Sequence, residues 1–247
     1  MLEDSNIPEP TMDQVYSDSD ADLTLISSDN VAFRVYAFHL GTSPVLMDMI
    51  KVLPRCKSDI PFSDSQMEDS HTIRYLLNIL HNNHSELDWN TLGFFRNTIS
   101  FVKKYEMILV QSFLSVQLRR YLENGGAERY CFILAAELDD ISIAAAAIEK
   151  GGRQTFVNNG DKYSSGWFDQ GQIVERQRLI ESGKWGFVDG CAIMNPTAWP
   201  LWELRRVPFE YVNSLGRTYQ RFPFGHKTSD VQAAAQYFKQ LMEDLKV

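Results

Sequence analysis

The sequence predicts an α+β fold, in which a small sheet flanked by helices is followed by a mainly helical C-terminal domain. Two short runs of alternating apolar and polar residues, with turn-forming residues between them, predict a β-hairpin. Beyond residue 43 the apolar residues recur three and four places apart, which predicts helices. Because a hairpin with one apolar face is not stable alone, we expect the helices to cover it directly.

The predicted hairpin lies within residues 22–36. Apolar residues stand at alternate positions over 23–25 and again over 31–35. Ser28-Asp29-Asn30 lies between the two runs, and Asp and Asn tolerate the positive φ that a tight hairpin turn requires. The sequence therefore predicts two antiparallel strands joined by a short turn.

Two helical segments are predicted directly after the hairpin. Residues 38–41 suit a single helical turn, Ser43 has the residue type of an N-cap, and Pro44 suits the first position of a helix. Pro54 is expected to end this helix. The apolar residues that share one face of it are Val45, Leu46, Met49 and Ile50.

The chain from there to residue 124 is predicted to hold one edge strand and three helices. Residues 60–62 are a short apolar piece, and Pro61 within it is tolerated only at the edge of a sheet. Ser70 has the residue type of the next N-cap. Apolar residues with helical spacing follow over 73–80, 92–102 and 110–121, and breaks fall at 81–84, 103–105 and 124–126.

Residues 127–247 are predicted to form the helical C-terminal domain. Its middle, 153–200, has weak periodicity and many glycines, so we expect a loop-rich connection there. Helices are expected at 129–138, 141–150, 173–181, 199–204, 208–215 and 229–245. The tryptophans expected mainly as core residues are Trp167, Trp185, Trp199 and Trp202. The buried side of the last helix is expected to consist of Val231, Ala234, Ala235, Phe238, Leu241, Met242 and Leu245.

The acidic charge of the chain is concentrated at its beginning. The net charge is −8, but residues 1–20 hold six acids and no Lys or Arg, so the rest carries only −2. We expect residues 1–19 to be a flexible acidic tail, with a short docking segment at 12–16 as the alternative. A body this close to neutral lacks the positive charge of a nucleic-acid-binding protein, so no nucleic-acid partner is expected.

Cysteine usage and hydropathy indicate the compartment. Cys56, Cys131 and Cys191 are odd in number, far apart and without metal-binding spacing, which argues against a disulfide framework. The acidic start is unlike a signal peptide, and no run of about 18 apolar residues is present to span a bilayer. We expect an intracellular protein, cytoplasmic or nuclear, without a membrane partner.

Three sets of residues carry side chains that are candidates for chemistry. His81 and His84 are three apart and could share a metal, but they flank two asparagines at a helix end with no third ligand nearby. Cys131 lies in an apolar segment, which favours a buried thiol over a nucleophile. The acids Glu137, Asp139 and Asp140 surround a predicted helix start, where carboxylates favour the positive end of the helix dipole. We therefore predict no enzyme and no catalytic, cofactor-binding or metal-binding residue.

Several short motifs occur in order along the first half of the chain. They are "ADLTLISSDNVAFRVYAFHLGTSPVLMDMI" at 21–50 and "FVKKYEM" at 101–107. Over residues 20–124 this order resembles the BTB/POZ domain of fungal type. Residues 129–152 resemble the start of a BACK-like helical region, and "NPTAWPLWELRRVPFEYVNSLGR" at 195–217 resembles the C-terminal portion of fungal BTB proteins. The resemblance implies a non-enzymatic module that forms a two-fold dimer with the same patch on each side.

The chain departs from this pattern in two places. Asp22 matches the family's buried acid, but Tyr36-Ala37 stands where a basic partner for that acid is common. We therefore expect Asp22 either to accept backbone hydrogen bonds or to belong to an altered dimer. The loop of residues 51–62 also lacks the glutamate of the apolar-x-Glu motif found in cullin adaptors.

The sequence thus predicts self-association through the first helices of the BTB-like domain. The candidate interface residues are Asp22, Phe38, Leu40, Val45, Leu46 and Met49. We expect about half of the apolar ones to face a partner, because others must pack under the hairpin. Two alternatives stay open: a substrate adaptor for a cullin-type ubiquitin ligase, and an enzyme with its site in residues 153–247.

Overall fold

The computed structural model describes residues 8–53, 58–152, 194–196, 199, 201–222 and 228–246. They form a mixed α+β protein with two compact units. The N-terminal unit comprises Met1–Ser85 and Phe94–Leu114, and the C-terminal unit comprises Glu86–Gly93 and Ser115–Val247. The predicted α+β class is therefore confirmed.

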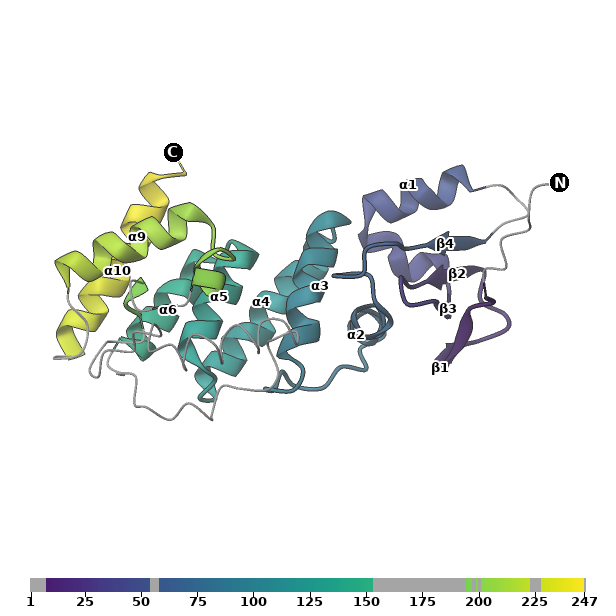
Figure 1. The fold of residues 1–247 in the computed structure, drawn as a ribbon, viewed down its shortest axis with the longest axis horizontal. Coiled ribbons are helices and arrows are strands. Elements are labelled where there is room, and N and C mark those ends of the chain that lie inside the picture. The colour runs from purple at the N-terminus through teal and green to yellow at the C-terminus, as the bar shows by residue number, and fades with distance from the viewer. Residues whose placement is uncertain are drawn as a thin grey trace. The chain divides into compact units, whose positions relative to one another are not determined.

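The predicted hairpin is present at the centre of a four-stranded sheet. Strands β2 (Leu23–Ile26) and β3 (Val31–Val35) are antiparallel, with Leu25 opposite Phe33, and Asn30 in the turn has a φ of 63°. Strand β4 (Asp59–Pro61) pairs in parallel with β2 at the edge, which is the place predicted for Pro61. The strand order is β1-β3-β2-β4, with β1 and β4 at opposite edges (Figure 1).

Strand β1 (Thr11–Ser17) corrects the expectation of a flexible tail for residues 11–17, and it includes the segment 12–16 that was the docking alternative. It pairs in parallel with β3, and Asp13 and Tyr16 are buried while the residues around them are exposed. Two inward side chains three places apart do not follow the two-residue period of a strand, so the alternation rule does not detect β1. The register shifts between Met12 and Ser17, which explains the irregular spacing.

The helices of the N-terminal unit cover the hairpin as predicted. The 3₁₀ helix η1 (Ala37–Thr42) is followed at once by α1 (Pro44–Val52), and Ser43 caps α1 by accepting a hydrogen bond from the Leu46 amide at 3.0 Å. Helix α1 ends two residues before Pro54. The apolar core of this unit includes Leu25, Phe33, Leu40, Leu46, Ile73, Leu76 and Leu77.

Three helices lie where the helical spacing of apolar residues predicts them: α2 (Ser70–Leu80), α3 (Leu92–Lys104) and α4 (Ile108–Glu123). One detail is corrected: the N-cap of α2 is Asp69, whose carboxylate accepts from the His71 and Thr72 amides at 2.9 and 3.0 Å. The break after α2 contains Asn82 with a φ of 55°, and α4 is followed by Gly125 with a φ of 93°.

The regular secondary structure described in the C-terminal unit is helical. It contains α5 (Glu128–Leu138), α6 (Ile141–Gly151), α8 (Leu201–Leu204), α9 (Phe209–Arg221) and α10 (Thr228–Asp244). Helix α6 packs against α5 and α10, and α10 also packs against α9. Trp199 is buried with its ring edge-on to Phe132 at 5.7 Å, as expected of a core tryptophan.

Three further expectations need comment. Helix α9 runs six residues beyond the predicted 208–215, because Leu215 and Thr218 continue its buried face past Gly216. Leu245 is exposed rather than buried, since α10 ends at Asp244. Several predictions concern residues outside the described part of the chain: the helix at 173–181, Trp167, Trp185, Cys56 and Cys191. The side chain of Trp202 is also not described.

Candidate interaction surface

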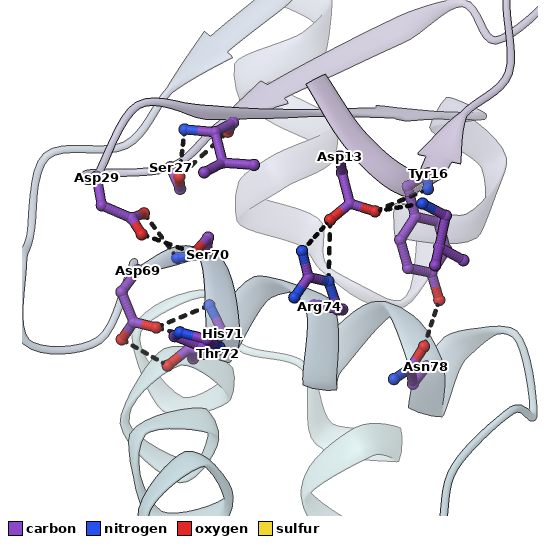
Figure 2. A network of polar contacts seen from close by, with 12 residues as sticks. Asp13, Tyr16, Ser27, Asp29, Asp69, Ser70, His71, Thr72, Arg74 and Asn78 are labelled. Atoms are coloured by element: carbon purple, nitrogen blue, oxygen red, sulfur yellow. Dashed lines mark hydrogen bonds and ion pairs between the residues drawn. The ribbon is translucent and has the colours of Figure 1, made fainter. Parts of the chain in front are cut away.

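Strand β1 is held against the N-terminal unit by a buried carboxylate (Figure 2). One oxygen of Asp13 accepts from the amides of Val15 and Tyr16 at 2.8 and 2.9 Å, and the other accepts from Arg74 Nε at 2.9 Å and from Arg74 Nη2. Burial alone raises the pKa of Asp13, but these hydrogen bonds and the Arg74 charge bring it below its usual value. The Tyr16 hydroxyl donates to Asn78 Oδ1 at 2.8 Å, so two side chains of β1 bind α2.

A second contact joins the hairpin turn to the start of α2. The Asp29 carboxylate accepts from the Ser70 amide at 2.8 Å and from the Ser70 hydroxyl at 2.6 Å. Burial raises the pKa of Asp29, while hydrogen bonds from Ser27 and Ser70 lower it to a net value below the usual range. Asp29 therefore orients the turn from which β3 begins.

Glu68, like Asp13, is a buried carboxylate of this unit. It accepts from Lys104 Nζ and the Tyr105 hydroxyl at 2.6 Å each, and from the Ser63 and Asp64 amides at 2.9 and 2.7 Å. Burial acts to raise its pKa, but these donors lower it overall, and burial together with Glu68 raises the pKa of Tyr105. All three carboxylates are saturated by hydrogen bonds, so we interpret them as structural.

One exposed apolar surface of the N-terminal unit lies on α1. This nine-residue helix carries six apolar side chains, yet Leu46 is the one that is fully buried. Val45 and Met49 are partly exposed, and Val52 is 81% exposed. These three residues are spaced i, i+4 and i+7, so they form one stripe along the helix, which we call the α1 stripe.

The predicted interface residues thus divide into two sets. Leu40 and Leu46 are fully buried inside the subunit and do not contribute to its surface. Val45 and Met49 lie on the α1 stripe, while Phe38 is 71% exposed on η1. Sequence reasoning missed Val52, although its position seven residues after Val45 would have placed it on the same face.

Phe38 belongs to a second surface, which we call the acidic–aromatic corner and define as Asp18, Asp20, Asp22, Tyr36 and Phe38. The Phe38 ring centroid lies 5.7 Å from that of Tyr36. The Tyr36 hydroxyl donates to Asp18 Oδ2 at 2.9 Å. That hydrogen bond raises the pKa of Tyr36, as do burial and the charges of Asp18, Asp20 and Asp22.

Asp22 is exposed, and its carboxylate accepts from the Ala37 amide at 2.8 Å, where η1 begins. The chain thus realises the first of the two outcomes expected for this acid, a backbone donor in place of the missing basic residue.

The two candidate metal ligands of the sequence have different surroundings. Nδ1 of His81 lies 2.8 Å from the Leu77 carbonyl oxygen, and its ring lies 4.1 Å from that of His39. The ring of His84 instead packs edge-on against Phe113. Within the described ranges, no group of three or more His, Cys, Asp or Glu side chains is placed to hold a metal ion.

The other candidates for chemistry have structural surroundings. Cys131 is fully buried, and burial followed by the charge of Glu128 raises the pKa of its thiol to about 12. Asp140 is the N-cap of α6, accepting from the Ile143 amide at 3.0 Å. Asp139 ends α5 with a φ of 60° and accepts from the Tyr211 hydroxyl at 3.0 Å and from Lys246 at 2.7 Å. Burial, and then Asp139, raises the pKa of Tyr211.

Comparison of the chain with protein-family models, with curated proteins and with solved structures finds no match. Among the helices that the structure describes, none combines the length and apolar character needed to cross a membrane.

Proposed function

We propose that this chain is a non-catalytic protein-interaction module of BTB/POZ type, which associates with a second copy of itself through the α1 stripe. The observation that carries the proposal is the composition of α1, six apolar residues of nine with one fully buried. Leaving such a helix exposed to water is unfavourable, and covering it gains roughly 25 cal/mol for each Å² of apolar surface that is buried.

The element order supports the BTB/POZ type. A hairpin, a short helical turn, a capped helix, an edge strand and three helices follow one another at the positions that the resemblance implies. A two-fold dimer would set the α1 stripe against its own copy, because residues near a two-fold axis meet their equivalents. Uncharged apolar side chains tolerate that arrangement, and Val45, Met49 and Val52 have no charge to repel.

The test is the mass of the full chain in solution, measured by size-exclusion chromatography with light scattering. We expect a dimer at micromolar concentration for the natural chain and a monomer for the double variant Met49→Gln, Val52→Glu. A control variant, Ile108→Gln with Leu109→Gln, changes two exposed apolar residues of the same unit outside α1 and should remain dimeric. A natural chain that is monomeric at 50–100 μM, about the upper range of such measurements, would refute the proposal.

Two alternative functions stay open, a cullin adaptor and an enzyme. If the chain does not bind an immobilised cullin N-terminal domain, the adaptor hypothesis is wrong. The glutamate-free loop at 51–62 already disfavours it. The enzymatic hypothesis concerns 153–247, of which residues 153–193 lie outside the described part of the chain.

A further inference from the structure

The acidic–aromatic corner exposes most of one large aromatic side chain. Phe38 is 71% exposed, and its ring centroid lies 5.7 Å from that of Tyr36 and 4.0 Å from that of His39. Its neighbour Leu40 is fully buried, so η1 already contributes its anchor to the core. Exposed aromatic rings of this kind are enriched at the centres of protein interfaces.

The charges around this ring select the partner. Asp18 accepts the Tyr36 hydroxyl at 2.9 Å and Asp22 accepts the Ala37 amide at 2.8 Å, so both carboxylates lie at residues just before Phe38 in the chain. The Asp20 amide donates to Asp18 at 2.9 Å, which places a third acid close by. Arg34 is the basic side chain that contacts this region, donating to the Ser19 carbonyl oxygen at 3.1 Å and acting on Asp18. Three acids against one base leave the corner negatively charged, so it attracts cations.

A second copy of the same corner does not fit this surface. In a two-fold contact the three carboxylates would meet three more, and like charges brought together across an interface disfavour binding. The corner is therefore a surface separate from the uncharged α1 stripe, and its occupant differs in charge from the corner itself.

Arginine is the residue that matches both features. Its planar guanidinium stacks on an exposed aromatic ring and donates paired hydrogen bonds to carboxylates, whereas the compact ammonium of lysine does less of each. The exposed Asp22 already accepts the Ala37 amide through Oδ1, and Asp18 accepts the Asp20 amide and the Tyr36 hydroxyl. These bonds fix the carboxylates of Asp18 and Asp22 at the residues that precede Phe38, which lowers the entropy lost on binding.

We propose that the acidic–aromatic corner binds an arginine-containing basic segment of another protein, with a guanidinium stacked on Phe38 and paired with Asp18, Asp20 and Asp22. This proposal stands independently of self-association through the α1 stripe.

The test titrates the full chain with the peptide Gly-Arg-Gly-Arg-Gly-Arg and follows it by calorimetry and by amide chemical shifts. We expect binding that shifts the amides of residues 18–22 and 36–39. The variant Asp18→Asn, Asp20→Asn, Asp22→Asn keeps side-chain acceptors for the local hydrogen bonds and should weaken binding at least tenfold. A control variant with the same charge change at exposed positions elsewhere, Asp59→Asn, Glu86→Gln, Glu123→Gln, should weaken it less than twofold.

The aromatic contribution is tested separately. Phe38→Ala should weaken the arginine peptide at least threefold, and the lysine peptide Gly-Lys-Gly-Lys-Gly-Lys should bind the natural chain more weakly than the arginine peptide. Equal losses in the corner and control variants would overturn the proposal, because they would indicate unspecific attraction to an acidic protein. Equal binding of both peptides with no effect of Phe38→Ala would also overturn it. The monomeric α1 variant should bind the peptide normally, which separates the two proposals.

Discussion

Asp13 of β1 and Arg74 of α2 form an ion pair across 61 residues of sequence, with the Asp13 side chain fully buried and that of Arg74 39% exposed. Figure 2 shows the Arg74 side chain directed from α2 towards the carboxylate. The same carboxylate accepts two amides of its own strand, so one acid both shapes β1 and attaches it to the unit.

Replacing Asp13 by Ala should therefore detach β1. The change leaves the Arg74 guanidinium and the Tyr16 amide without their acceptor, and an unsatisfied buried donor costs about 2 kcal/mol. We expect a lower free energy of unfolding in urea and faster amide exchange over residues 11–17. Asp59→Ala, an exposed acid of β4, serves as the control and should change neither quantity. Unchanged amide exchange in β1 would show that backbone pairing with β3 is enough to hold β1 on the sheet.

Acid should destabilise the N-terminal unit through three carboxylates that accept several hydrogen bonds each. The folded-state pKa values of Asp13, Asp29 and Glu68 lie below their ordinary values of 3.8 and 4.5. A depressed pKa contributes stability that is present above the unfolded pKa and is lost as the pH falls through the folded pKa. Stability should thus be level above about pH 5 and decline below it.

The measurement for this pH dependence is urea unfolding from pH 7 down to pH 3. In Glu68→Gln the decline should be shallower, since one of the three titrating groups is absent. A decline as steep as in the natural chain would mean that Glu68 does not contribute to it.

Cys131 should resist alkylation in the folded protein. With a pKa of about 12, the thiolate at pH 8 is present at roughly one part in ten thousand, and the side chain is fully buried. In a variant with Cys56→Ser and Cys191→Ser, iodoacetamide labelling followed by mass spectrometry should be negligible without denaturant and complete in 6 M guanidinium, about the usual denaturing concentration. Rapid labelling of the folded chain would indicate that α5 opens locally.

The glycines after α4 should differ from Gly41 in their tolerance of alanine. Gly125 has a φ of +93°, which an L side chain rarely adopts, and a Cβ at Gly126 would lie 2.6 Å from the Tyr121 carbonyl oxygen. We expect Gly125→Ala to cost about 1 kcal/mol. Gly126→Ala should cost more, because its clash involves backbone.

Gly41→Ala is the matched control, since no atom lies within 4 Å of a Cβ placed there. Thermal unfolding of the three variants gives the comparison. Equal melting temperatures for all three would mean that the turn after α4 rearranges freely.

Local chemistry in the sequence was enough to predict most elements. Four of these features each depend on residues within four places of one another. They are the Asn30 turn, the Ser43 cap followed by Pro44, the edge position of Pro61 and the cap at Asp140. Such features can be recognised from sequence because the interacting groups are neighbours along the chain.

The tertiary structure alone decided which apolar and acidic residues are covered. Sequence reasoning left open which of Phe38, Leu40, Val45, Leu46 and Met49 face inward, and the structure buries Leu40 and Leu46 while leaving Phe38 exposed. Sequence reasoning also assigned Asp13 and Tyr16 to a flexible tail, although both are buried in β1. Their partners, Arg74 and Asn78, stand 61 and 62 residues away, and no local pattern can carry a contact over that distance, because only the folded chain brings those groups together.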